Sequence, residues 1–115
     1  MQLVNHTRKI IVSNNVHSAI DILSRVKGLI GKKSLSNDEC MFFPNCNSIH
    51  TFFMSVDIGL ILIDSKFRVV KIVALLKPYR IILPILSAKH VIEVSPEFTL
   101  KNVSHGDVLE LKQCK

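Results

Sequence analysis

Residues 58–76 read IGLILIDSKFRVVKIVALL, and this stretch decides the fold. Two apolar runs rich in β-branched residues, 58–63 and 69–76, have the composition of strands. The polar segment 64–68 joins them and predicts a hairpin. Because neither run alternates with polar residues, we expect two neighbouring central strands that are covered on both faces.

The sequence around this hairpin predicts more strands and one helix. Other β-prone pieces occupy residues 2–4, 9–12, 40–43, 49–54, 91–94 and 108–111. Between about 18 and 30 the apolar residues instead repeat at helical spacing, with Ser18 as the expected N-cap. A short helical turn is expected at 99–103. One helix beside about six or seven strands predicts a mainly β (α+β) fold, a compact sandwich or barrel.

Length and composition limit the classes of protein that fit. The chain has 115 residues, of which 48% are hydrophobic and 21% charged, so we expect a single folded domain over 1–115. No apolar run approaches the ~18 residues of a membrane span. The first fifteen residues lack the apolar core of a signal peptide, which predicts a cytoplasmic protein unless an export leader has been removed.

Charge and cysteine content give little support for nucleic-acid, metal or cofactor binding. The net charge is +6, but the basic residues are scattered and the chain has no Trp and one Tyr, so we expect no specific nucleic-acid partner. No phosphate-binding loop is present, and we expect no cofactor. Three cysteines are too few for a secreted disulfide scaffold, and Cys40 and Cys46 are interpreted as mainly reduced thiols.

The segment 44–54, PNCNSIHTFFM, gathers most of the candidate site residues. If it is extended, Cys46, Ser48 and His50 share one face with two large apolar residues. This is typical of a strand that runs from the mouth of a pocket into the core. The alternative is a buried thiol and a histidine bound to the backbone.

Two chemical alternatives to a binding pocket use the same residues. Cys46 and His50 could form a nucleophile and base, but four residues of strand separate them by ~13 Å. A metal site could use Cys40, Cys46 and His50, although this spacing matches no common zinc pattern. The separation of Cys46 and His50 counts against catalysis, which stays open as an alternative, and we expect no metal site.

Glu93 is the other anomaly, because it lies between Ile92 and Val94 in an apolar strand. A carboxylate there either faces water or is buried with a partner. Arg25 and His50 are the candidate partners.

Three segments together resemble the bacterial and archaeal family known as domain of unknown function 192. They are RVKGLIG at 25–31, CNSIHTFFM at 46–54, and VIEV at 91–94 with Gly106-Asp107 downstream. The resemblance covers about 18–111 and implies a mainly β, sandwich-like fold without an established activity. In two places this chain departs from the family pattern, with Gly59 in place of an Asp and Glu97 near a usual Gly.

These patterns lead to one functional hypothesis and two alternatives. The hypothesis is a small binding or accessory domain that takes a small polar or anionic ligand or a peptide. Its candidate ligand-binding residues are Arg25, Cys46, Ser48, His50 and Glu93. The alternatives are a Cys/His-dependent enzyme and a purely structural or protein-interaction module, and the oligomeric state is left open.

Overall fold

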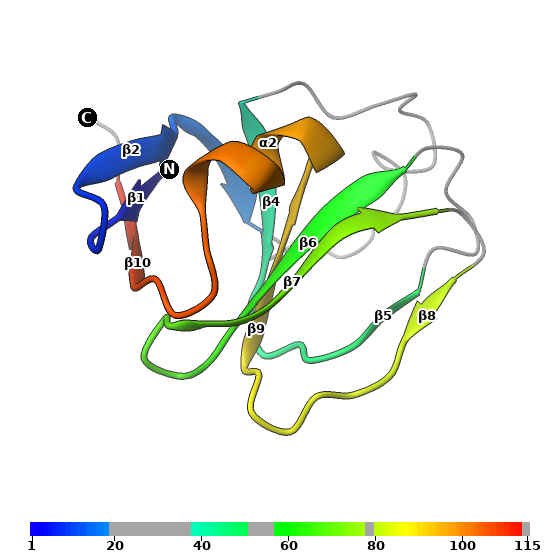
Figure 1. Cartoon of the computed structure of the whole chain (residues 1–115). Helices are drawn as coiled ribbons and strands as arrows, with labels where there is room; N and C mark the ends of the chain where they lie inside the picture. Colours follow the sequence, from blue (N-terminus) through cyan, green and yellow to red (C-terminus); the bar gives the residue numbers. More distant parts are fainter. Residues whose placement is uncertain (19–37, 51–56, 78–79, 114–115) are drawn as a thin grey trace.

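The computed structural model describes residues 1–18, 38–50, 57–77 and 80–113, and it is mainly β (Figure 1). The described elements are β1 (Gln2–Asn5), β2 (Ile10–Ser13), β3 (Asn15–Ser18), β4 (Glu39–Phe43), β5 (Ile49–His50), β6 (Ile58–Ile63), β7 (Val69–Leu76), β8 (Ile81–Ile82), β9 (His90–Val94), α2 (Pro96–Asn102) and β10 (Leu109–Lys112). They form a three-stranded sheet β10-β1-β2, a five-stranded sheet β3-β4-β9-β6-β7 and a two-stranded ribbon β5-β8. The mainly β prediction is confirmed, although the strands form more elements than the six or seven expected.

The hairpin predicted at 58–76 is present with the expected strand bounds. β6 and β7 pair antiparallel, and every residue of β6 is buried. The turn between them is held by Asp64, whose Oδ1 accepts hydrogen bonds from the backbone N–H groups of Lys66 and Arg68, each at 2.9 Å. An aspartate that bonds its own backbone in this way stabilises a tight turn.

The prediction that both strands are central is correct for β6 and wrong for β7. β6 lies between β7 and β9, whereas β7 is the edge strand of the five-stranded sheet. The exposure of β7 agrees with this edge position, because only Val69 and Leu76 of its eight residues are buried. Strand order depends on partners distant in the sequence, so an apolar run alone does not place a strand inside a sheet.

The predicted helix at 18–30 would begin where β3 ends. Ser18 is the last residue of β3, which pairs in parallel with β4, and since an N-cap residue also has an extended backbone, the predicted cap stays a prediction. The remainder of the predicted helix lies outside the described residues. The later helical turn is present, but α2 begins earlier than expected, at Pro96, and Glu97 lies in its first turn. A carboxylate there is favoured by the helix dipole, so this position needs no glycine.

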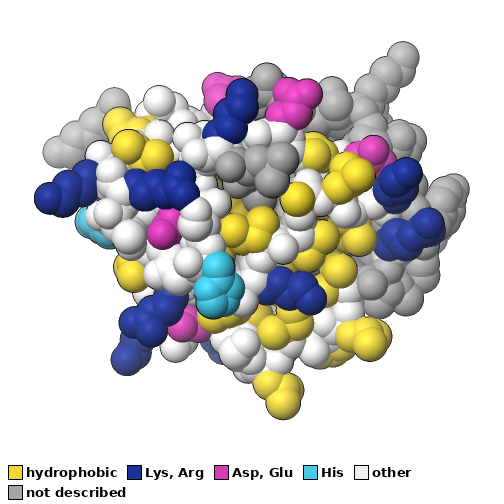
Figure 2. Space-filling view, viewed as in Figure 1, with side chains coloured by type: hydrophobic (Ala, Val, Ile, Leu, Met, Phe, Trp, Pro, Cys, Tyr) yellow, Lys and Arg dark blue, Asp and Glu magenta, His cyan; other side chains and the backbone are white. Residues whose placement is uncertain are grey.

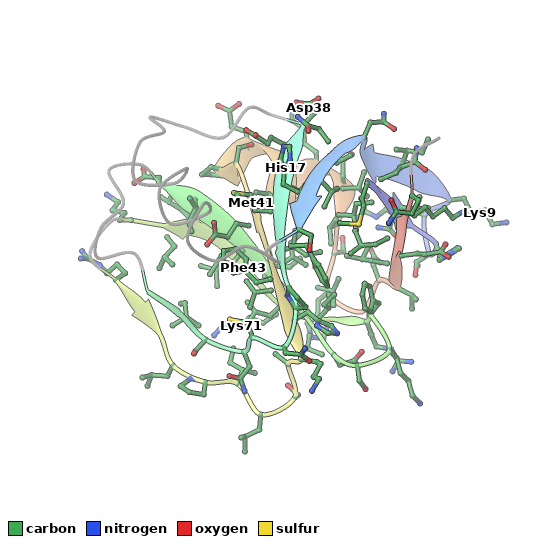
Figure 3. All side chains as sticks on the ribbon, turned by 180° about the vertical axis from the view of Figure 1, so that it is seen from behind. Lys9, His17, Asp38, Met41, Phe43 and Lys71 are labelled. Atoms are coloured by element: carbon green, nitrogen blue, oxygen red, sulfur yellow. The ribbon has the colours of Figure 1, made fainter. Side chains whose placement is uncertain are left out.

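Two hydrophobic cores lie on opposite faces of the five-stranded sheet. The first core joins that sheet to the three-stranded sheet and includes Leu3, Ile61, Ile92 and Leu109. The second core includes Leu60, Leu62 and Val91, with Ile82 and Ile85 of the β8 region packed against it. Figure 3 shows the sheet from behind, with Met41 and Phe43 labelled on β4.

A buried polar network ties the two ends of the chain together. The Oδ2 atom of Asp107 accepts hydrogen bonds from Asn5 Nδ2 at 2.8 Å and from the Ser104 backbone N–H at 2.9 Å, and it lies 3.4 Å from Arg8 Nε. The preceding Gly106 has φ +89°, a conformation that a side chain disfavours. The Gly-Asp pair therefore has a structural role, since it sets the entry into β10.

Candidate functional site

The structure describes three of the five predicted site residues in full. Cys46 and Ser48 are half-buried beside the turn that follows β4, and Glu93 lies in β9. His50 belongs to β5, but its side chain lies outside the described part, as does the whole of Arg25. Whether Arg25 or His50 contacts Glu93 therefore stays a prediction.

The chain between β4 and β5 is bent where we considered an extended strand. Asn45 has φ +54°, and the Cys46 thiol donates a hydrogen bond to the carbonyl oxygen of Ser48 at 2.9 Å. A side chain that contacts the carbonyl two residues later is incompatible with a fully extended segment. Cys46 and Ser48 therefore do not lie on one strand face, and the alternation predicted from Cys46 onward is wrong for this part. The reason is the turn at Pro44 and Asn45, which leaves β5 to begin only at Ile49.

Backbone contacts fix this bend against the start of β9. The Cys46 N–H donates to the Lys89 carbonyl at 2.9 Å, and the Asn45 N–H donates to Nδ1 of His90 at 3.1 Å. His90 therefore accepts at Nδ1, which requires that nitrogen to be unprotonated. Burial, with a smaller contribution from the neighbouring Lys89, lowers the pKa of His90 below its ordinary value of 6.5.

A small pocket of about 170 Å³ opens beside Cys46. It is lined by Asn45, Cys46, Asn47, Ala88 and Lys89. Its polar groups are two amides, a thiol and an ammonium group, which suit a small anion or the polar end of a larger molecule. Cys46 also packs against the second core, so the pocket lies at the margin of that core.

Glu93 is buried in the middle of the five-stranded sheet. It is 2% exposed and pairs with Met41 of β4 on one side and Leu60 of β6 on the other. The structure therefore excludes a solvent-facing glutamate. A carboxylate in such an apolar row is costly to bury, which distinguishes this position from the rest of β9.

The Cys46 pocket and Glu93 lie at different positions along β9. The Cys46 backbone N–H donates to the Lys89 carbonyl just before β9, and Glu93 lies four residues after Lys89 in the chain. Four residues of strand span about 13 Å, so one small ligand group cannot contact both.

The described thiols differ in their surroundings. Cys40 and Cys46 are both free, with Cys40 buried and Cys46 half-buried. Burial raises the pKa of the Cys40 thiol to about 12, so it stays protonated at neutral pH. Within residues 1–18, 38–50, 57–77 and 80–113, no three His, Cys, Asp or Glu side chains group as a metal would require.

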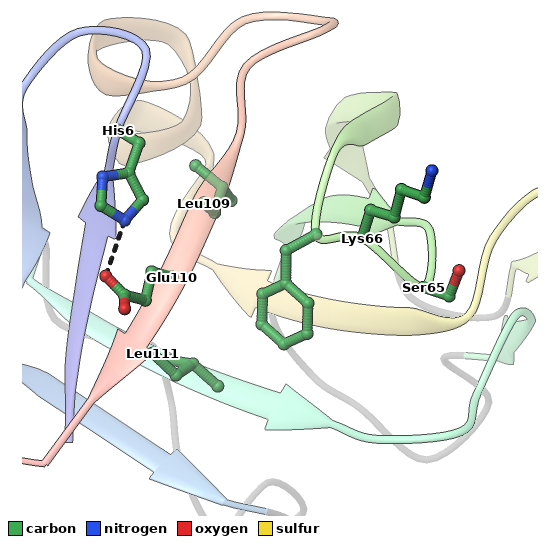
Figure 4. A pocket seen from close by; sticks show the side chains of 7 residues that line it. His6, Ser65, Lys66, Leu109, Glu110 and Leu111 are labelled. Atoms are coloured by element: carbon green, nitrogen blue, oxygen red, sulfur yellow. Dashed lines mark hydrogen bonds and ion pairs between the residues drawn. The ribbon is translucent and has the colours of Figure 1, made fainter.

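Sequence reasoning missed a second, larger hollow. A groove of about 400 Å³ lies between β10 and the β6–β7 turn, and Figure 4 shows its lining side chains. The lining residues are His6, Ser65, Lys66, Phe67, Leu109, Glu110 and Leu111. They come from three distant segments that carry no shared motif, so no local sequence signal could have found the groove.

The fold and these features define a class: a small, mainly β domain with a carboxylate buried in its larger sheet and a thiol at a pocket beside it. None of its described helices has both the length and the apolar character that crossing a membrane requires. The family model of domain of unknown function 192, described as an uncharacterised ACR, matches residues 3–111. The chain belongs to this family, and the match begins before residue 18, where the resemblance was expected to start.

Individual relatives agree with this assignment. A UPF0127 protein from Pyrococcus horikoshii is 33% identical over 109 residues, covering 84% of this chain and 92% of that protein. A crystal structure of a protein of unknown function from Novosphingobium aromaticivorans has a TM-score of 0.74 at 20% identity, covering 96% of this chain and 82% of that one. A candidate transcription regulator from Sinorhizobium meliloti has a TM-score of 0.75 at 20% identity, covering 95% and 89%. These two similarities concern the fold alone.

Proposed function

We propose that this chain is a single small binding domain, and that its ligand site begins at the pocket beside Cys46. The observation that supports this most is the half-buried thiol in a polar pocket at the margin of an apolar core. Ligand sites combine an apolar lining with a few polar groups that fix orientation. A volume of about 170 Å³ is smaller than that of a typical drug-sized site, so it suits the polar end of a small molecule or peptide.

The charge at this pocket favours an anionic group. Lys89 is exposed and supplies a cation, while Asn45 and Asn47 supply amide donors. The proposal extends the site to Ser48, His50 and Arg25, which would contact the rest of a ligand larger than the group held in the pocket. Because Glu93 is only 2% exposed, its proposed part is to orient neighbouring donors of the site from within the sheet.

Thiol protection tests this proposal directly. In a C114S background, Cys46 is alkylated with iodoacetamide while small carboxylates, phosphate and short peptides are screened. Because Cys40 is buried and protonated, Cys46 reports the reaction. A ligand of the site slows alkylation of Cys46, and K89A weakens that protection.

A matched lysine variant separates binding from stability. K9A removes an exposed positive charge from the turn between β1 and β2, in the other sheet, and should leave protection unchanged. If E93Q and K89A keep every detectable ligand interaction while only thermal stability falls, the site is structural and the proposal is abandoned.

The enzyme alternative needs an activated Cys46. Its thiol donates a hydrogen bond to a carbonyl, an arrangement that uses the protonated form, whereas the thiolate is the nucleophile. Alkylation of Cys46 much faster than a free model thiol would favour this alternative over simple binding.

One observation supports the protein-interaction alternative. Leu83 is 74% exposed and Leu86 is 97% exposed in the loop between β8 and β9, and Leu75 on the edge strand β7 is 49% exposed. Figure 2 shows hydrophobic side chains gathered over the region of β6 and β7, with others projecting at the lower edge. Concentration-dependent self-association that L83D/L86D abolishes would support this alternative, and a monomer at every concentration would count against a self-pairing module.

A further inference from the structure

We propose that the groove between β10 and the β6–β7 turn is a separate binding site for a small organic carboxylate with an apolar, preferably aromatic, body. This site is distinct from the Cys46 pocket, which is formed by the turn after β4 and the start of β9. The two sites share no lining residue. The inference therefore does not depend on the function proposed above.

The apolar part of the groove has fixed walls. Leu109 and Leu111 extend from β10 on one side, and the β6–β7 turn with Lys66 and Ser65 lies on the opposite side (Figure 4). Phe67 belongs to the same turn and also lines the groove. The Leu109 N–H donates to the Phe67 carbonyl at 2.8 Å, so the two walls are joined at their base. A groove held by backbone bonds loses little conformational freedom when a ligand enters.

Phe67 is held in an unusual conformation. Its φ is +61°, which is rare for a bulky residue. The ring is supported from behind by Phe42 at 5.9 Å and His90 at 5.2 Å between centroids. These contacts present the ring of Phe67 as a rigid face on which an aromatic ligand can stack.

The polar groups give the groove a direction. On the β10 side, Glu110 lies 2.6 Å from His6 Nε2 and 3.7 Å from Lys112 Nζ, so its carboxylate already has cationic or donor neighbours. On the turn side, Lys66 and the hydroxyl of Ser65 offer donors, and no ion pair involves Lys66 among the described residues. A ligand carboxylate is therefore attracted to Lys66 and repelled by Glu110, with the apolar body between them.

The size and charge of the groove fit this ligand class. A volume of about 400 Å³ is within the range of small-molecule sites, and it exceeds that of the Cys46 pocket. The chain carries a net charge of +6, which adds a general attraction for anions. Each charged contact at this exposed rim is modest, so we expect weak binding that decreases with added salt.

An NMR titration with 3-phenylpropionate tests the inference. We expect amide shifts at Lys66, Phe67 and Leu111, and an apparent Kd about two- to fivefold higher for the uncharged 3-phenylpropanamide. K66A should weaken 3-phenylpropionate binding by the same factor, so that 3-phenylpropionate and 3-phenylpropanamide bind the variant with equal Kd. Because Lys66 is exposed in a turn, its replacement should leave the fold intact.

Control variants keep the result decisive. K71A removes another exposed lysine and should bind 3-phenylpropionate like the wild type. Absence of shifts up to the solubility of the probe would overturn the proposal. So would shifts confined to residues 45–47 and 88–89, equal affinity for acid and amide, or wild-type affinity in K66A.

Discussion

Replacing Asp107 with alanine should cost about 3 kcal/mol of unfolding free energy. The substitution removes the acceptor shared by Asn5 Nδ2 and the Ser104 backbone N–H, and it leaves Arg8 without its nearby carboxylate. Hydrogen bonds to a charged group contribute about 1.5–3 kcal/mol each. Two of them would give about 3–6 kcal/mol, and we take the lower value because Asn5 keeps a second acceptor in the Asn102 carbonyl at 3.0 Å.

Urea unfolding followed by circular dichroism measures this loss. With an m value of about 1.5 kcal/mol/M, the midpoint should fall by about 2 M at unchanged m. D107N keeps one acceptor oxygen and loses the charge, so it should cost only about 1 kcal/mol. D57A is the matched control, since Asp57 is exposed, and it should stay within about 0.5 kcal/mol of wild type. A D107A loss below 1 kcal/mol, or no larger than that of D57A, would refute the structural role of this network.

Three further changes test the turn, the core and the histidine. G106A should cost about 1–2 kcal/mol in urea unfolding, because φ is +89° while nothing lies within 4 Å of an added Cβ; a neutral result would contradict the backbone argument. I61A should lower the unfolding free energy by about 2–5 kcal/mol, since Ile61 is 0% exposed. A loss under 1 kcal/mol would mean that neighbouring side chains fill the cavity left by the substitution. The His90 pKa is lowered below 6.5 by folding, so its contribution to stability is present above pH 6.5 and decreases as the pH falls through the lower folded value. Wild type should therefore lose more unfolding free energy than H90Q between pH 7 and pH 5, and equal losses would exclude this role.

The parts of the fold that sequence predicted were those set by local pattern. The bounds of β6 and β7 followed from apolar runs that end at Asp64 and begin again at Val69. The Asp64 turn is local as well, whereas the helical turn expected at 99–103 begins earlier, at Pro96. Sheet order could not be predicted, because β9 inserts between β4 and β6 although it begins 27 residues after the end of β6. Pairing between distant segments also placed β7 at the edge of the sheet and paired Val16 of β3 with Cys40 of β4.

The candidate site was predicted in part for a similar reason. The burial of Glu93 could be anticipated as one of two outcomes from its apolar neighbours. The bend at Asn45 was harder to predict, because the contact that holds it comes from His90, which is 45 residues away. The groove at Phe67 combines residues from positions 6, 65–67 and 109–111, which only the folded chain brings together.

The bond between Asn5 and Asp107 also bears on how the protein is made in the cell. It joins residues that are 102 positions apart, and β1 pairs with β10 in the same sheet. While the ribosome is still adding residues up to 112, β1 has no β10 beside it, and the apolar β6 has already emerged. We therefore expect folding to finish only after this last strand leaves the exit tunnel, so the apolar strands of the nascent chain stay incompletely paired until then.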